Sequence, residues 1–110
     1  MKWIIVRDII DSAGDPVDDT IVLRVSDDNF YDAVTFTKET IADAKWQGKI
    51  DSTKEDFVWN LDTVITDMLD TKGIKYERHS TYPESTPGKL DEALDKYWIY
   101  YDDLTEDGEQ

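Results

Sequence analysis

Apolar residues recur at helical spacing in residues 52–73, a pattern that predicts an amphipathic helix with one buried face. Ser52 and Glu55 have the spacing of a capping box, and Gly73 stands where a left-handed residue would end the helix. The apolar face comprises Phe57, Val58, Leu61, Val64, Ile65, Met68 and Leu69. The opposite arc carries Asp56, Trp59, Asp62, Asp67 and Asp70. We expect the rest of the chain to pack against the apolar face.

A second helical pattern covers residues 29–47 and ends at Gly48. The residues expected to face the core are Phe30, Ala33, Val34, Thr37, Ile41 and Ala44. Asp32, Glu39 and Asp43 share the other side of this helix, because their spacing matches successive helical turns. The short connection 49–51 favours an antiparallel pair, an αα-hairpin.

Four segments have the β-branched or aromatic character of strands: 2–10, 20–25, 74–80 and 97–101. The first has apolar residues on both faces, which favours an interior position in the sheet. Residues 89–95 are expected to form one or two helical turns. The order β-β-α-α-β-β predicts a two-layer α+β fold, with a four-stranded, mostly antiparallel sheet and the αα-hairpin on one face. We expect one domain over residues 1–101 and a flexible acidic tail over 102–110.

Composition and the amino terminus limit where the protein is expected to act. The chain has 110 residues, of which 39% are hydrophobic and 12% aromatic, and this favours a folded domain. The first charges come too early for a signal peptide, and no apolar run approaches the ~20 residues of a membrane span. The sequence therefore predicts a cytoplasmic protein that does not bind membranes.

The chain lacks the usual motifs of an enzyme. It has no cysteine and one histidine, His79, so thiolate chemistry and a typical zinc site are excluded. No glycine-rich phosphate loop or nucleophile turn is present. The loop containing Asp11, Asp15, Asp18 and Asp19 could bind calcium, but it does not match an EF-hand, and a solvated turn is the simpler interpretation. We expect neither enzyme activity nor a cofactor; a carboxylate-based or metal-assisted hydrolase is the least favoured alternative.

The net charge of −14 is the main functional clue. The 19 Asp and 7 Glu outnumber 9 Lys and 3 Arg, so the protein should repel nucleic acid and attract basic proteins. The charge could instead serve solubility alone. Adaptation to high salt would also favour Asp, but the excess of Lys over Arg argues against it. Duplex DNA as long as this domain is wide, roughly 34 Å, carries about 20 phosphate charges, which is comparable with the charge of the chain.

The sequence thus predicts a non-enzymatic acidic inhibitor that binds the basic nucleic-acid-binding surface of another protein, as a DNA mimic does. In size, acidity and lack of cysteine the chain is similar to phage antirestriction and anti-CRISPR proteins and to immunity proteins of nuclease toxins. That likeness implies a nuclease or other nucleic-acid-binding protein as the partner.

The candidate contact residues combine the acids with one aromatic anchor. We expect Trp59 to be the anchor, unless it packs under the first helix or under the loop of residues 81–88. The candidate partner-binding residues are Asp32, Glu39, Asp43, Asp56, Trp59, Asp62, Asp67, Asp70, Asp102 and Asp103. The alternative is a small assembly or scaffold protein that self-associates, for example as a homodimer, through an exposed sheet face that includes residues 97–101.

Overall fold

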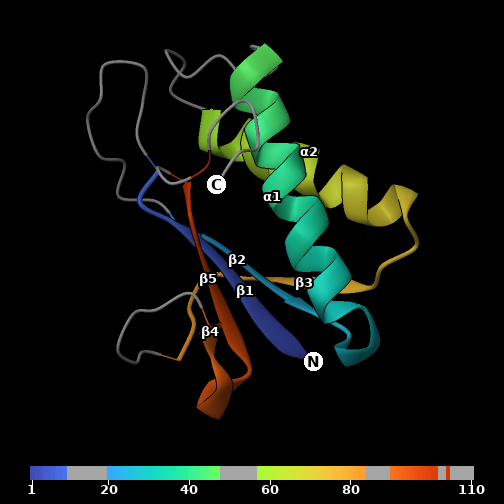
Figure 1. The fold of residues 1–110 in the computed structure, drawn as a ribbon, viewed down its shortest axis with the longest axis vertical. Helices are drawn as coiled ribbons and strands as arrows, with labels where there is room; N and C mark the ends of the chain where they lie inside the picture. Colours follow the sequence, from blue (N-terminus) through green and yellow to red (C-terminus); the bar gives the residue numbers. More distant parts are fainter. Residues whose placement is uncertain (10–19, 48–56, 84–89, 102–103, 105–110) are drawn as a thin grey trace.

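Two helices cover one face of a five-stranded sheet in the computed structural model (Figure 1). The structure describes residues 1–9, 20–47, 57–83, 90–101 and 104. The strands are β1 (Lys2–Arg7), β2 (Ile21–Val25), β3 (Tyr76–His79), β4 (Leu90–Asp91) and β5 (Lys96–Tyr100). The helices are α1 (Phe30–Gln47) and α2 (Phe57–Thr71), with short 3-10 turns η1 (Asp27–Asn29) and η2 (Glu92–Leu94). The predicted α+β class is confirmed.

The sheet is mixed and has the order β3-β2-β1-β5-β4, so the predicted number of four strands is wrong by one. The prediction of a mostly antiparallel sheet holds, because β1–β2, β2–β3 and β4–β5 are antiparallel and only β1–β5 is parallel. The additional strand, β4, falls within residues 89–95, where helical turns were expected. Asp95 adopts a left-handed conformation with φ of 49°, and the reversal around it lets Leu90 pair with Tyr97 and Asp91 with Lys96. A two-residue strand is too short to show a hydrophobic alternation.

β1 lies in the interior of the sheet, as predicted, between β2 and β5. The β1–β5 pairing is parallel, which the sequence analysis did not anticipate. The parallel pairing follows from the directions in which the successive strands run. β3 is antiparallel to β2 and therefore ends at the same end of the sheet as β1. β4 then runs back, and β5 must run in the direction of β1.

The main core lies between the helices and the sheet. All six residues of α1 that were predicted to face the core are buried, namely Phe30, Ala33, Val34, Thr37, Ile41 and Ala44. α2 contributes the buried side chains of Leu61, Ile65 and Leu69. They meet Ile4 and Val6 of β1 and Leu23 of β2 in one cluster.

The end of α2 is closed as the sequence predicts. Gly73 has a φ of 72° and its N–H donates to the Asp70 carbonyl at 3.1 Å. The N–H of Ile74 donates to the Leu69 carbonyl at 2.9 Å, which completes a Schellman motif. The predicted capping box of Ser52 and Glu55 lies outside the described residues.

The two helices do not form the expected antiparallel pair. In Figure 1 they cross obliquely on their common face of the sheet. Each helix makes polar contacts with a different strand: Lys38 of α1 reaches Tyr97 of β5, whereas Thr66 of α2 bonds to Arg78 of β3. These two strands lie on opposite sides of the β1–β2 pair.

The second face of the sheet carries a smaller core. Ile5, Val22 and Trp98 are buried there. The chain that follows β3 packs on them, since the ring of Tyr82 meets Trp98 edge-on at 5.4 Å and Lys96 Nζ donates to the Pro83 carbonyl. The aromatic strand β5 therefore offers less open surface on this side than the self-association hypothesis requires.

Candidate protein-binding surface

Acidic side chains line one side of α1. Asp32 and Glu39 are exposed and Asp43 is half-buried; their spacings of seven and four residues place them on the same side of the helix. We call these three residues the α1 acidic stripe. Among the described residues, no cation lies within ion-pair distance of Asp32 or Glu39, or of the exposed Asp28 one turn earlier. Their charges are therefore available to a partner.

Two described lysines close to the helices, Lys38 and Lys72, lie on aromatic rings. Lys38 Nζ is 4.9 Å from the ring centroid of Tyr97 and donates to its hydroxyl at 2.8 Å. Lys72 Nζ is 4.1 Å from the ring centroid of Phe36. Such contacts contribute about 0.5–1 kcal/mol at exposed sites. They hold the two ammonium groups on aromatic rings, and among the described residues neither lysine forms an ion pair with Asp32 or Glu39.

Tyr31 is an exposed aromatic residue that the sequence analysis missed. It is 62% exposed, and its ring packs edge-on against Phe30 at 5.2 Å. Asp32 follows it directly. Its position in the helical repeat, one residue after the core residue Phe30, places it on the polar side of α1 and could have identified it from the sequence. An exposed tyrosine among acids is typical of an interface anchor.

Several predicted contact residues lie outside the described part of the chain. Trp59 belongs to α2, but its side chain is not among those described. Asp56, Asp102 and Asp103 lie wholly outside the described residues. Their part in binding stays a prediction.

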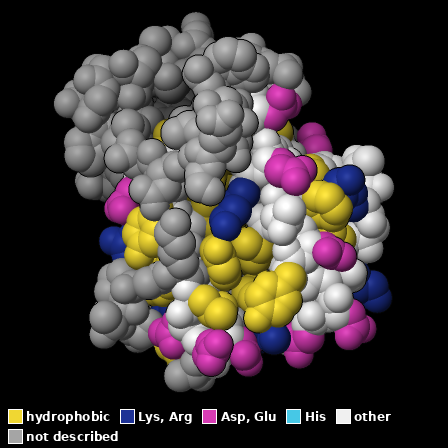
Figure 2. Space-filling model, viewed as in Figure 1, with side chains coloured by type: hydrophobic (Ala, Val, Ile, Leu, Met, Phe, Trp, Pro, Cys, Tyr) yellow, Lys and Arg dark blue, Asp and Glu magenta, His cyan; other side chains and the backbone are white. Residues whose placement is uncertain are grey.

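The surface in Figure 2 combines charge with a hydrophobic centre. Hydrophobic side chains gather in the middle of the described surface, and acidic side chains lie around them with Lys and Arg interspersed. The negative charge on this side is thus not an unbroken patch. An apolar centre inside a polar rim is the usual arrangement of a protein–protein interface.

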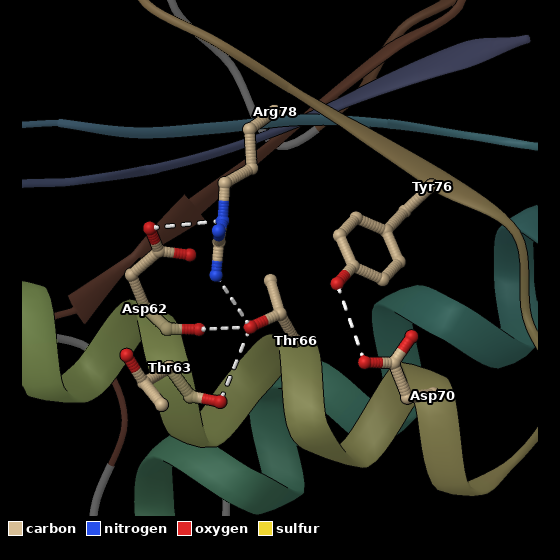
Figure 3. Close-up of polar contacts among 6 residues, drawn as sticks. All are labelled: Asp62, Thr63, Thr66, Asp70, Tyr76 and Arg78. Carbon is tan, nitrogen blue, oxygen red and sulfur yellow. Dashed lines mark hydrogen bonds and ion pairs between the residues drawn. The ribbon is translucent and has the colours of Figure 1, made fainter.

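The acids of α2 have different surroundings. Asp67 and Asp70 are exposed, and the Tyr76 hydroxyl donates to Asp70 Oδ2 at 3.4 Å. Asp62 instead lies between α2 and β3, with a side chain only 18% exposed. Its Oδ2 is 3.4 Å from Arg78 Nε (Figure 3). Asp62 therefore has less charge to offer a partner than its neighbours.

Arg78 links α2 to β3 through a small polar cluster (Figure 3). Its Nη2 donates to Thr66 Oγ1 at 2.8 Å, and that hydroxyl donates in turn to the carbonyls of Asp62 and Thr63 at 3.1 and 3.2 Å. Burial raises the pKa of Asp62 above its ordinary value of 3.8, although Arg78 acts in the opposite direction. Asp62 Oδ1 is buried and has no hydrogen-bond partner.

Replacing Asp62 by Asn should stabilise the protein at neutral pH by up to about 1 kcal/mol, because the buried charge is removed while the half-exposed Arg78 stays hydrated. A raised pKa means that the folded state favours the protonated carboxyl, so the penalty of ionised Asp62 grows as the pH rises above 3.8. The gain from D62N should therefore disappear near pH 3. Urea denaturation of both proteins at pH 3 and pH 7 measures this; a D62N variant that is less stable at pH 7 would show that the Arg78 pair outweighs burial.

Potential metal ligands, the histidine and an open hollow of the described residues bear on the question of catalysis. No group of three or more potential metal ligands occurs among them. His79 is exposed; its Nε2 lies 3.0 Å from Glu77 Oε1 and its ring meets Trp3 at 4.9 Å. An open hollow of about 700 Å³ at the start of β3 is lined by Met1, Asp70 and residues 73–77. The proposed calcium loop of residues 11–19 lies outside the described part.

Comparison with protein-family models, with curated proteins and with solved structures gives no match. Within the described ranges, no helix combines the length and apolar character needed to cross a membrane.

Proposed function

We propose that this protein is a non-enzymatic acidic inhibitor that binds the basic nucleic-acid-binding surface of another protein. The observation that carries the proposal is that Asp32 and Glu39 form no ion pair with any described residue, while Lys38 and Lys72 lie on aromatic rings. In a chain of net charge −14, a basic partner would supply the missing counter-charges. Complementary charge of this kind speeds encounter and selects the partner.

Contacts at short range would then hold the complex together. Tyr31 can bury its exposed ring against the partner, and aromatic residues of this kind contribute a large share of binding energy at interfaces. The hydrophobic centre seen in Figure 2 supports the same mode of binding. Release would be slowed mainly by these apolar contacts, and encounter would be accelerated mainly by the acids.

DNA mimicry needs acids from more than one element. The α1 acidic stripe spans eleven residue steps, or about 16 Å of helix, with three charges, whereas duplex DNA carries one charge per ~1.7 Å. Asp28, Asp67 and Asp70 are exposed and can extend the acidic surface. Asp62 adds least, because Arg78 already lies against it.

The proposal is tested by capture and competition. The full chain is immobilised and incubated with an extract at low salt, and retained proteins are identified by mass spectrometry. We expect basic nucleic-acid-binding proteins that elute as salt is raised, because screening weakens charge-led binding, and that are displaced by added duplex DNA. Retained proteins that duplex DNA does not displace would contradict the mimic mechanism.

Self-association through the second face of the sheet is the alternative proposal. Less apolar surface is exposed there for a second copy to cover, because Ile5, Val22 and Trp98 of that face are already buried within one chain. Sedimentation over a range of concentrations separates the two proposals: the inhibitor proposal requires only a monomer, whereas a scaffold must show a concentration-dependent mass.

A further inference from the structure

Cations gather on tryptophan rings on the second face of the sheet. Arg7 Cζ lies 5.1 Å from the ring centroid of Trp98, and Lys96 Nζ lies 4.5 Å from the same ring. On the neighbouring pair, Arg24 Cζ lies 4.9 Å from the ring centroid of Trp3. Two of the three arginines of this acidic chain are therefore on one face, opposite the helices.

The parallel pairing of β1 with β5 creates this arrangement. Ile5 pairs with Trp98 and Arg7 with Tyr100, so Arg7 stands one same-face position beyond the tryptophan. Lys96 stands two residues before Trp98 and faces the same way. It is fully buried and donates to the Pro83 carbonyl. Its charge has no carboxylate partner within ion-pair distance among the described residues.

Two donor atoms on this cation–ring pair have no hydrogen-bond acceptor. Arg7 Nε and Trp98 Nε1 are both buried and unpartnered, and Trp98 is only 2% exposed. Buried donors are nearly always paired in folded proteins, so two on adjoining residues need an explanation. The nearby carboxylate of Asp8 is half-exposed and stays 3.6 Å from Arg7 Nε, too far for a hydrogen bond.

We propose that Arg7 and Trp98 form a binding site for an oxyanion, a carboxylate or a phosphate, with Lys96 adding positive charge behind the tryptophan. One oxyanion can accept hydrogen bonds from both orphan N–H groups, and such charge-assisted bonds are stronger than neutral ones. The ring of Trp98 holds the guanidinium in place, so little ordering is needed on binding. This site is separate from the acidic surface proposed above and takes a ligand of opposite charge.

The acids of the chain oppose an incoming anion, and the test allows for this. At about 0.15 M salt the Debye length is ~8 Å, so distant carboxylates are screened. Asp8, 3.6 Å from Arg7 Nε, is close enough to compete with the anion for the guanidinium. The full chain, labelled with ¹⁵N, is titrated with sodium phosphate and, separately, with sodium acetate. Sodium chloride at matched ionic strength is the reference for each titration.

We expect the Trp98 indole N–H and the Arg7 Nε–H signals to shift along one saturable curve with phosphate or with acetate, and not with chloride. The salt that saturates at the lower concentration identifies the preferred oxyanion. The Trp98 signal is assigned by its loss in W98F. The remaining indole signals serve as internal references.

Two substitutions of Arg7 make the result decisive. R7Q should abolish saturation, whereas K75Q, the same charge change at an exposed lysine, should leave it unchanged. R7K keeps the charge but lacks the Nε–H group, and it should weaken binding at least about fivefold while the rest of the spectrum stays folded. Shifts that are linear and equal in all three salts, or an R7K variant that binds as tightly as the natural chain, would overturn the proposal.

Discussion

Replacing Trp98 by alanine should lower the free energy of unfolding by about 3–5 kcal/mol, the usual range for removing a large buried aromatic side chain. Trp98 is 2% exposed. It packs with Ile5 and Val22 in the smaller core, and its ring also meets Tyr82. Since domains of this size are stable by only about 5–15 kcal/mol, the loss would be a large share of the total.

Urea denaturation at neutral pH measures this effect. Tyr31→Ala is the matched control, because it removes an aromatic ring that is 62% exposed; we expect it to change stability by no more than about 0.5 kcal/mol. A loss below about 1 kcal/mol for W98A would show that the second face of the sheet is not a core. That face would then offer an open aromatic surface through which the protein could self-associate.

The helices could be predicted because their information is local. Each core position of α1 follows from the helical repeat alone, and all six are buried. The end of α2 could be predicted as well, because Gly73 is the residue type that adopts a φ of 72° without strain. The interior place of β1 followed from apolar residues on both of its faces.

The order of the sheet could not be predicted, because strand pairing depends on residues far apart in the sequence. β1 pairs with β5 more than ninety residues later, and no periodicity within either strand specifies that neighbour. The contact between Tyr82 and Trp98, which covers the second face, is equally non-local. The turn at Asp95 has no glycine or asparagine to announce its left-handed conformation.

In the candidate site, too, the local helical pattern could be predicted and the contacts between distant residues could not. The helical repeat places Asp62 on one arc with Asp67 and Asp70, yet β3 runs beside that arc and brings Arg78 against Asp62 alone. The repeat cannot reveal such a partner, because it describes one helix in isolation. Cation–ring contacts such as that of Lys72 with Phe36 are likewise invisible in the sequence. They fix where the positive charges of the surface lie without changing its net charge.

Reversing the α1 acidic stripe should weaken binding to a basic protein captured by this chain by about 10- to 100-fold, equivalent to about 1.4–2.8 kcal/mol. The variant D32K/E39K replaces two exposed carboxylates, neither of which pairs with a described cation, with ammonium groups, so attraction becomes repulsion. Most of the loss should appear in the association rate, as is usual for charges at the rim of an interface. Surface plasmon resonance at several salt concentrations measures both rates.

Single substitutions separate position from total charge. E39K and E92K change the net charge equally, and both replace exposed glutamates, but Glu92 lies in η2 between β4 and β5 and not on the helical layer. If the α1 acidic stripe contacts the partner, E39K should slow association several-fold more than E92K, and the difference should shrink as salt is added. Equal effects of the two variants would mean that only the overall charge steers the partner. The contact surface would then have to lie elsewhere on the molecule.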